Sequence, residues 1–238
     1  MDGTMPEPFA AWFAGQGWTP RPHQLAMLSA GAAGESILLI APTGGGKTLA
    51  GFLPTLVDLA TSPRQGLHTL YVSPLKALAV DIARNLVRPV EEIDLPIRIE
   101  TRTGDTPANR RARQREVPPH ILLTTPESLA VLLSLPDAPA LFATLSCIVL
   151  DEVHALAGTK RGDQLALGVA RLRTLAPAAR ASPHRRCRRR KLRSHPERRR
   201  AIDHRLFKTA GSGAADGSLP EERSADGPGV APAGQIDR

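Results

Sequence analysis

The stretch that most constrains this chain is residues 38–48, Leu-Leu-Ile-Ala-Pro-Thr-Gly-Gly-Gly-Lys-Thr. An apolar run leads into three glycines, then Lys47 and Thr48, and a segment compatible with a helix follows. Glycines let backbone N–H groups turn toward a polyphosphate with no Cβ in the way. Lys47 supplies a positive charge for the outer phosphates, and the Thr48 hydroxyl is a candidate Mg²⁺ ligand. The next helix directs its positive N-terminal end at the same anion, so we predict a nucleotide phosphate site here.

The predicted phosphate-binding residues are Thr43, Gly44, Gly45, Gly46, Lys47 and Thr48. Ala41 stands where the usual pattern has its first glycine. The alternative is a glycine-rich turn that merely joins a strand to a helix. The Lys-Thr pair and the apolar segments on both sides favour the phosphate site over that turn.

Short apolar runs alternate with helix-compatible segments over most of the chain. Strands are expected at residues 36–40, 69–73, 97–101, 121–124 and 147–150, and helices at 8–15, 22–30, 48–59, 75–86, 108–115, 126–133 and 163–175. Continuous apolar strands are typical of a parallel sheet that is covered on both faces. The alternation therefore predicts an α/β domain, with a mainly parallel, doubly wound sheet flanked by helices.

A second catalytic pattern follows the apolar run at residues 147–150, which leads directly into Asp151 and Glu152. Open α/β sheets bind ligands at the edge where their strands end, so both acids are expected at that edge. Asp151 is the predicted second Mg²⁺ ligand. Glu152 is predicted to orient or deprotonate the attacking water. Adjacent acids after a strand can also be a helix N-cap, but their combination with Lys47 favours catalysis.

The composition excludes several classes of protein. No apolar run reaches the roughly 20 residues that span a bilayer, so no membrane partner is expected. The first residues are acidic and lack the pattern of a signal peptide. Cys147 and Cys187 are the only cysteines, which argues against a disulfide framework or a cysteine-rich zinc site. A cytoplasmic location fits these features best.

The formal net charge of +8 is concentrated in one segment. Residues 1–183 carry 17 Lys+Arg against 16 Asp+Glu, whereas residues 184–200 carry ten against one. The regular alternation stops near residue 180, and the last part of the chain is rich in Gly, Ala, Ser, Pro and Asp. Such a segment has too little apolar surface to offset the entropy of ordering. We therefore predict a domain at residues 1–180 and a disordered tail, first basic and then of low complexity, at residues 181–238.

Five motifs, in order, resemble those of one family. They are residues 41–48, Val-Ser-Pro-Leu-Lys-Ala-Leu at 72–78, Arg-Thr-Gly-Asp at 102–105, Thr-Thr-Pro-Glu-Ser-Leu at 124–129 and Asp-Glu-Val-His at 151–154. Residues 9–180 thereby resemble the N-terminal RecA-like domain of superfamily 2 DExH/DEAD-box helicases, especially the large helicase-related group and its DNA-ligase-associated branch. Alanine at position 41 is usual in that superfamily. The resemblance implies a RecA-like P-loop NTPase fold, ATP and Mg²⁺ as cofactors, and ATP hydrolysis coupled to movement along nucleic acid.

The resemblance also implies roles for further residues. Gln24 occupies the position of an adenine-reading glutamine, although it could simply be a polar residue at a helix N-terminus. His154 occupies the position that senses the γ-phosphate and couples two lobes, with a plain surface histidine as the alternative. The motifs that line the nucleic-acid track contribute Pro74, Leu75, Lys76, Thr125, Pro126 and Glu127. Loop N–H groups, a hydroxyl and one lysine can hold a phosphodiester without reading bases, although Lys76 could also lie in a solvated loop.

The chain departs from the family beyond about residue 180, where the Ser-Ala-Thr element and a second RecA-like domain would follow. We expect the ATP-binding domain of a DNA helicase or, as the alternative, a truncated or frame-shifted fragment that binds nucleotide and nucleic acid without unwinding. Single-stranded DNA and DNA-repair partners are expected by analogy with the resembled group. Residues 184–200 could also be a genuine nucleic-acid-binding arm. A small P-loop kinase or another ATPase is a further alternative, but residues 74–76 and 125–127 have no task there.

Overall fold

The computed structural model describes residues 4–41 and 46–186 of the 238-residue chain. In this part of the chain six strands form one sheet in the order β1-β6-β5-β2-β4-β3, and each neighbouring pair runs parallel. The strands are β1 Leu39–Ala41, β2 Thr69–Val72, β3 Ile99–Arg102, β4 Ile121–Thr124, β5 Cys147–Leu150 and β6 Arg180–Arg186. The predicted α/β class with a parallel sheet is confirmed.

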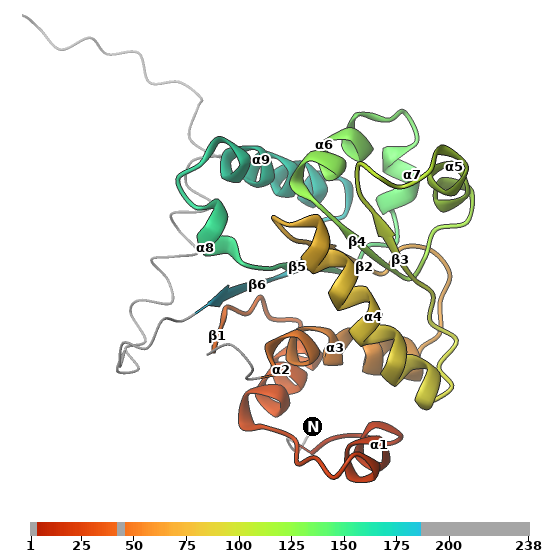
Figure 1. Cartoon of the computed structure of the whole chain (residues 1–238), viewed down its shortest axis with the longest axis vertical. Coiled ribbons are helices and arrows are strands. Elements are labelled where there is room, and N and C mark those ends of the chain that lie inside the picture. The colour runs from red at the N-terminus through yellow and green to blue at the C-terminus, as the bar shows by residue number, and fades with distance from the viewer. Residues whose placement is uncertain (1–3, 42–45, 187–238) are drawn as a thin grey trace, which may run out of the picture.

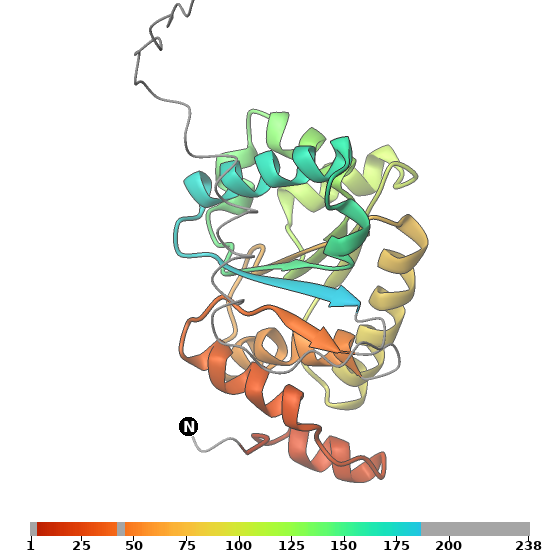
Figure 2. The same cartoon turned by 90° about the vertical axis from the view of Figure 1, so that its left-hand side faces the viewer.

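Helices cover both faces of this sheet (Figure 1). They are α1 Phe9–Gly15, α2 Pro22–Ala32, α3 Lys47–Thr61, α4 Lys76–Glu92, α5 Ala108–Glu116, α6 Pro126–Ser134, α7 Ala138–Phe142, α8 Val153–Leu156 and α9 Lys160–Leu175. Figure 2 shows the green-to-teal helices on one side of the strands and the red-to-orange helices on the other. Within the described ranges, no helix combines the length and apolar character needed to cross a bilayer.

The central strands contribute side chains to two separate apolar cores. On β2, Leu70 and Val72 join the core that also contains residues of α6, α7 and α9, whereas Tyr71 joins the core with residues of α1, α3 and α4. On β5, Ile148 and Val149 divide between the same two cores. Successive side chains of a strand point to opposite faces, so a strand covered on both sides buries every side chain and is mainly apolar. This explains why β2, β4 and β5 are buried along their whole length.

The predicted element ranges agree best where apolar runs are continuous. β4 and β5 occupy the predicted residues, whereas β1 begins at Leu39 instead of residue 36 and α9 begins at Lys160 instead of residue 163. Two short helices, α7 with five residues and α8 with four, were not predicted. Helices this short contain little more than one turn and therefore give no readable period of 3.6 residues.

β6 begins at residue 180, where the domain was predicted to end. The strand runs on to Arg186 and lies between β1 and β5, with His184 opposite Leu39 and Arg180 opposite Cys147. The physical reason is that the backbone groups of β1 and β5 require partners in the ladder, and a ladder is formed by backbone atoms whatever the side chains are. Residues 187–238 lie outside the described residues, so the disordered tail stays a prediction there.

Candidate functional site

The parallel strands bring their carboxyl ends to one edge of the sheet, where open α/β sheets bind ligands. The segments that follow the strands carry the predicted site residues: Lys47 and Thr48 beyond β1, Pro74, Leu75 and Lys76 beyond β2, Thr125, Pro126 and Glu127 beyond β4, and Asp151, Glu152 and His154 beyond β5. Residues that are far apart in the sequence thus share one edge. Thr43, Gly44 and Gly45 were also predicted as phosphate ligands and lie outside the described residues.

The phosphate-loop helix α3 starts immediately after a glycine in the left-handed region. Gly46 has φ 71° and ψ 24° and occupies the N-cap position, and Lys47 is the first helical residue. A side chain at this φ is strained, and a Cβ added to Gly46 would lie 3.1 Å from Nε2 of Gln24. The last glycine of the motif is therefore required by backbone conformation. Lys47 and Thr48, both half-buried, lie in the first turn, where helix N–H groups lack partners within the helix.

Gln24 lies beside the start of α3 and is buried, with 4% of its surface exposed. Its Oε1 accepts a hydrogen bond of 2.8 Å from the backbone N–H of Arg21, just before α2. This contact is the one expected if Gln24 is simply a polar residue at the N-terminus of a helix. Its Nε2 lies near Gly46, so the same amide faces the phosphate-loop helix. Adenine recognition by Gln24 stays a prediction.

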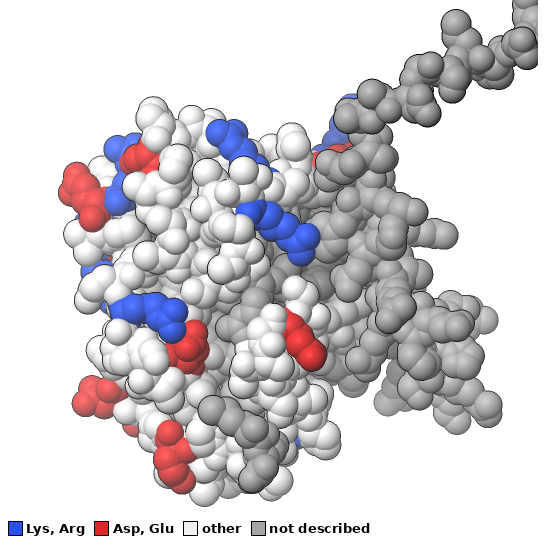
Figure 3. Space-filling model, turned by 180° about the vertical axis from the view of Figure 1, so that it is seen from behind, with Lys and Arg blue, Asp and Glu red and all other residues white. Residues whose placement is uncertain are grey.

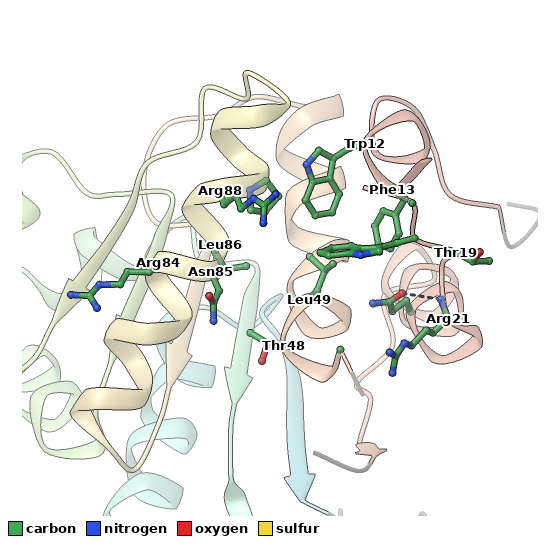
Figure 4. A pocket seen from close by; sticks show the side chains of 15 residues that line it. Trp12, Phe13, Thr19, Arg21, Thr48, Leu49, Arg84, Asn85, Leu86 and Arg88 are labelled. Carbon is green, nitrogen blue, oxygen red and sulfur yellow. Dashed lines mark hydrogen bonds between the residues drawn. The ribbon is translucent and has the colours of Figure 1, made fainter. Parts of the chain in front are cut away.

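A pocket of about 590 Å³ adjoins this helix start. Figure 4 shows Trp12 and Phe13 from α1 across from Asn85 and Arg88 of α4, with Thr48 and Leu49 of α3 between them. Trp18 completes the aromatic wall, with its ring centroid 5.5 Å from that of Trp12. The Trp12 and Trp18 rings meet edge to face, at an interplanar angle of 89°. An aromatic ring beside a helix N-terminus suits contact with a nucleotide base.

The aromatic wall was not predicted as part of the site, although the sequence carries a signal for it. Only eight residues of the chain are Phe, Trp or Tyr, and four of them fall within residues 9–18. Trp12 is fixed by a hydrogen bond of 2.7 Å from its Nε1 to Glu92 Oε2. Arg88 and Trp12 both donate to Glu92 and hold the pKa of that carboxyl below its usual value. The wall is thereby linked to α4.

Asp151 follows β5 and has both carboxylate oxygens engaged. Oδ1 accepts the backbone N–H of Glu152 at 2.8 Å, and Oδ2 accepts the hydroxyl of Tyr71 at 2.5 Å. The Asp151 backbone N–H bonds the carbonyl of Val72 at 3.0 Å, so the pairing with β2 continues one residue past β5. Burial and the neighbouring Asp151 charge raise the pKa of Tyr71, which is therefore a neutral hydrogen-bond donor. The orientation of the carboxylate is thus set by two neutral donors.

Glu152 and His154 form a pair next to Asp151. Glu152 has φ 48° and ψ 36°, a left-handed conformation that is costly for a residue with a side chain. Its Oε2 lies 3.2 Å from Nδ1 of the exposed His154, so its side chain pairs with this histidine instead of capping α8. The helix-cap alternative for the two acids is therefore not favoured. Strained backbone of this kind concentrates at functional sites.

The oxygen donors of this edge fit Mg²⁺ bound together with a nucleotide. The predicted ligands are one hydroxyl, that of Thr48, and one carboxylate, that of Asp151. Mg²⁺ is usually held by one or two carboxylates together with substrate phosphates and water. Among residues 4–41 and 46–186, no group of three or more His, Cys, Asp or Glu side chains could form a metal site made of protein alone. The donor set therefore suits a metal that arrives with phosphates.

Arg161 on α9 connects two of the segments predicted to contact nucleic acid. Its Nη2 donates to the carbonyl of Pro74 at 2.8 Å, and its Nε donates to Oε1 of Glu127 at 2.5 Å. The hydrogen bond from Arg161 is also the main cause that lowers the pKa of Glu127. At the start of α6, the Thr125 hydroxyl accepts the backbone N–H of Ser128. Arg161 was not predicted, because its partners lie 87 and 34 positions away in the chain.

Lys76 is the first residue of α4 and pairs with Asp105 of the predicted Arg-Thr-Gly-Asp motif. Its Nζ lies 2.9 Å from Oδ1 of Asp105, and both side chains are more than half exposed. An exposed pair of this kind contributes little to stability, about 0–1 kcal/mol, so Lys76 can leave it for a phosphate at small cost. Leu75, at the N-cap position, is 61% exposed. Lys76 is exposed, as the solvated-loop alternative expects, but it also forms an ion pair, which that alternative does not expect.

Charge is mixed over the surface of the domain. Figure 3, which views the molecule from behind, shows basic and acidic side chains interspersed on the described residues of that face. This agrees with the nearly balanced count of charged residues in positions 1–183. The described residues on that side therefore do not form a uniformly basic face that would attract a polyanion strongly.

The chain that has this geometry is similar in sequence to known proteins. The family model of the DEAD/DEAH box helicases matches residues 21–188. ATP-dependent helicase Lhr-Core protein 2 of Thermococcus barophilus is 42% identical over 185 residues, which cover 71% of this chain and 21% of that protein. The Lhr helicase/probable uracil glycosylase of Mycolicibacterium smegmatis is 46% identical over 174 residues, covering 68% and 12%.

A solved structure shares both the fold and the sequence pattern. The helicase Lhr of Mycobacterium smegmatis, bound to ssDNA and AMP-PNP, superposes with a TM-score of 0.65 and 44% identity over 74% of this chain and 23% of that one. The fold of the described residues is thus RecA-like, and the resemblance to the large helicase-related group is confirmed. The chain spans only a small part, 12–23%, of the length of these relatives.

Proposed function

Because this chain belongs to the DEAD/DEAH box helicase family, we propose that it provides the ATP-binding lobe of an ATP-dependent DNA helicase. In this proposal Lys47 and the N-terminus of α3 hold the outer phosphates, and Glu152 orients the attacking water. Mg²⁺, held by Thr48 and Asp151, offsets phosphate charge when it is bound. Gln24 and the aromatic wall receive the base.

The observation that carries the proposal is the arrangement across β6. The start of α3, with Lys47 and Thr48, follows β1 on one side of β6, and Asp151 with Glu152 follows β5 on the other side. Positive and acidic groups thereby border the same sheet edge. Phosphoryl transfer needs this combination, because a cation and helix N–H groups must stabilise the phosphates while an acid directs the nucleophile.

A nucleic-acid substrate is supported by the second group of loops at this edge. The segments around Pro74 and Thr125 are joined by Arg161, and each is followed by a helix whose N-terminus faces the edge. Such N-termini attract phosphates without reading bases. We extend the proposal, by analogy alone, to single-stranded DNA as the substrate, DNA-repair proteins as partners and the cytoplasm as the location.

Titration of the full chain with ADP tests the nucleotide site. We expect ADP to bind more tightly with Mg²⁺ than with EDTA, and Asp151→Asn to remove this difference. Asp81→Asn serves as the matched control, because Asp81 is an exposed acid on α4 that does not line the pocket. Absence of ADP binding, or equal behaviour of Asp151→Asn and the wild type, would refute the proposed nucleotide site.

For the 238-residue chain tested by itself, we propose nucleotide binding without strand separation. The described residues form one RecA-like lobe, and an arginine finger from a facing lobe is worth about 10³–10⁵ in rate. Single-stranded DNA should therefore leave phosphate release nearly unchanged, although the ten basic residues within 184–200 should still bind it. A large stimulation by DNA that Glu152→Gln abolishes would show instead that the lone lobe is competent.

A further inference from the structure

We propose that Tyr71 is a positioning residue for the metal-binding carboxylate of Asp151, and that it sets the spacing between this acid and the phosphate-loop helix. The inference rests on the proposed function, since Asp151 is a metal ligand only if the chain binds Mg²⁺ with a nucleotide. It adds a residue from β2 to a site otherwise formed by the segments after β1 and β5.

Strand register brings the two residues together. β2 and β5 are neighbours, with Tyr71 opposite Val149 and Val72 opposite Leu150. The Asp151 backbone N–H continues this pairing through the carbonyl of Val72. The Tyr71 hydroxyl then reaches Asp151 Oδ2 at 2.5 Å, although the residues are 80 positions apart. Both ends of the contact are held by sheet backbone, which is among the most rigid supports in a domain.

The ring of Tyr71 also contacts the phosphate-loop helix. It stacks on Phe52 of α3 with a centroid distance of 5.3 Å and an interplanar angle of 30°. Phe52 is 0% exposed and Tyr71 is 1% exposed, so neither ring has room to shift. α3 begins with Lys47 and Thr48, so one side chain touches the helix that carries the hydroxyl ligand and the acid that carries the carboxylate ligand. Tyr71 is thus a fixed spacer between the two.

The chemistry of the contact suits a metal ligand. A protonated phenol donates to one carboxylate oxygen, and the Glu152 N–H donates to the other. Both donors are neutral, so they fix the carboxylate plane without neutralising its negative charge. Groups that orient a metal ligand in this way change metal affinity by about 10–100-fold when they are removed.

A purely structural role predicts a different outcome. If Tyr71 served only to fill the core, removing its hydroxyl would alter the free energy of unfolding but not the response of the nucleotide site to Mg²⁺. Tyr71→Phe preserves the ring and the contact with Phe52 and deletes the hydroxyl alone. Thr55→Val is the matched control, because it removes another buried hydroxyl, bonded at 2.9 Å to Thr69 on the same strand β2.

The test measures ADP affinity of the full chain in Mg²⁺ and in EDTA. The ratio of the two affinities should fall about tenfold in Tyr71→Phe and stay at the wild-type value in Thr55→Val. ADP affinity in EDTA should be unchanged in both variants. A wild-type ratio in folded Tyr71→Phe, with a lost ratio in Asp151→Asn, would overturn this inference alone. A wild type without Mg²⁺-dependent ADP binding would overturn the proposed function and the inference with it.

A second measurement needs no substitution, because Tyr71 is the only tyrosine in the sequence. Growth with 3-fluorotyrosine gives one ¹⁹F resonance, which reports on this hydroxyl directly. Adding Mg²⁺ to the ADP complex should shift that resonance, and the shift should vanish in Asp151→Asn. A resonance that Mg²⁺ leaves in place, while Mg²⁺ tightens ADP binding, would contradict the spacer role.

Discussion

The guanidinium of Arg161 donates to the backbone carbonyl of Pro74 at 2.8 Å and thereby connects the start of α9 with the loop that follows β2. The same group donates to Glu127 at the start of α6. One side chain thus holds two loops of the proposed nucleic-acid track at a fixed separation. The contact with Glu127 is exposed and that with Pro74 only partly buried, so the arginine contributes more to loop geometry than to stability.

Arg161→Ala is expected to weaken binding of single-stranded DNA by several-fold and to leave ADP affinity unchanged, because the two loops lose their common anchor. The measurement is fluorescence anisotropy of a labelled oligonucleotide at elevated salt, where non-specific contacts of a basic segment fall steeply. Arg171→Ala, on the exposed side of the same helix, controls for the loss of one positive charge. Equal DNA affinity of the two variants would contradict the anchoring role.

Lys47→Ala is expected to weaken binding of Mg-ADP by about 10–100-fold, because a hydrogen bond to a charged group is worth about 1.5–3 kcal/mol. Calorimetric titration of the full chain measures the effect. Lys160→Ala is the control, since Lys160 is exposed and does not line the pocket. A variant that binds Mg-ADP as tightly as the wild type would place the phosphates elsewhere.

Gly46→Ala should lower the free energy of unfolding by about 1–2 kcal/mol, because φ at this position is 71°. It should also weaken ADP binding, since the new methyl group lies against Gln24 Nε2. Gly34→Ala separates the two effects: its φ is 75°, but nothing lies within 4 Å of an added Cβ. Urea unfolding should show similar losses in both variants. Reduced ADP affinity in Gly34→Ala as well would mean that strain alone, and not contact with Gln24, disturbs the site.

His120 should make stability depend on pH below about pH 6.5. Burial, and then the charge of Arg98, lower the pKa of this imidazole below its ordinary value of about 6.5. The unfolded chain then binds the proton more readily, so stability is intact above about pH 6.5 and declines as the pH falls from there toward the folded-state pKa.

His120→Gln should flatten this part of the pH profile of the urea midpoint, because an amide oxygen can still accept the N–H of Arg98, bonded to Nδ1 at 2.9 Å in the wild type. An unchanged slope in His120→Gln would assign the pH dependence to other groups.

The sequence was most informative where one local pattern determines one element. β4 and β5 were predicted to the residue, because a short and mainly apolar run has a single solution in a covered sheet. The predictions for Lys47, Thr48 and Asp151 rest on a similar local pattern, since each directly follows such a run or its glycine loop.

The rest depends on contacts that no local pattern contains. Tyr71 reads as one more apolar residue of β2 until the register with β5 brings its hydroxyl to Asp151. Arg161 reads as a surface arginine until α9 packs beside the loop at Pro74. β6 has no apolar period at all, and its place is determined by the backbone requirements of its neighbours.

The position of β6 has a consequence for the order in which the protein is assembled. β1 and the phosphate-loop helix are among the first segments to leave the ribosome, but β1 pairs with β6, nearly the whole described chain later. Contacts so distant in sequence form slowly, because a long loop must close before they contribute. β1, which precedes the phosphate loop, therefore cannot complete its pairing until β6 has been made. During synthesis, a chain that has passed His154 but has not yet reached Arg186 carries every predicted ligand of the site and still has no completed sheet to hold them.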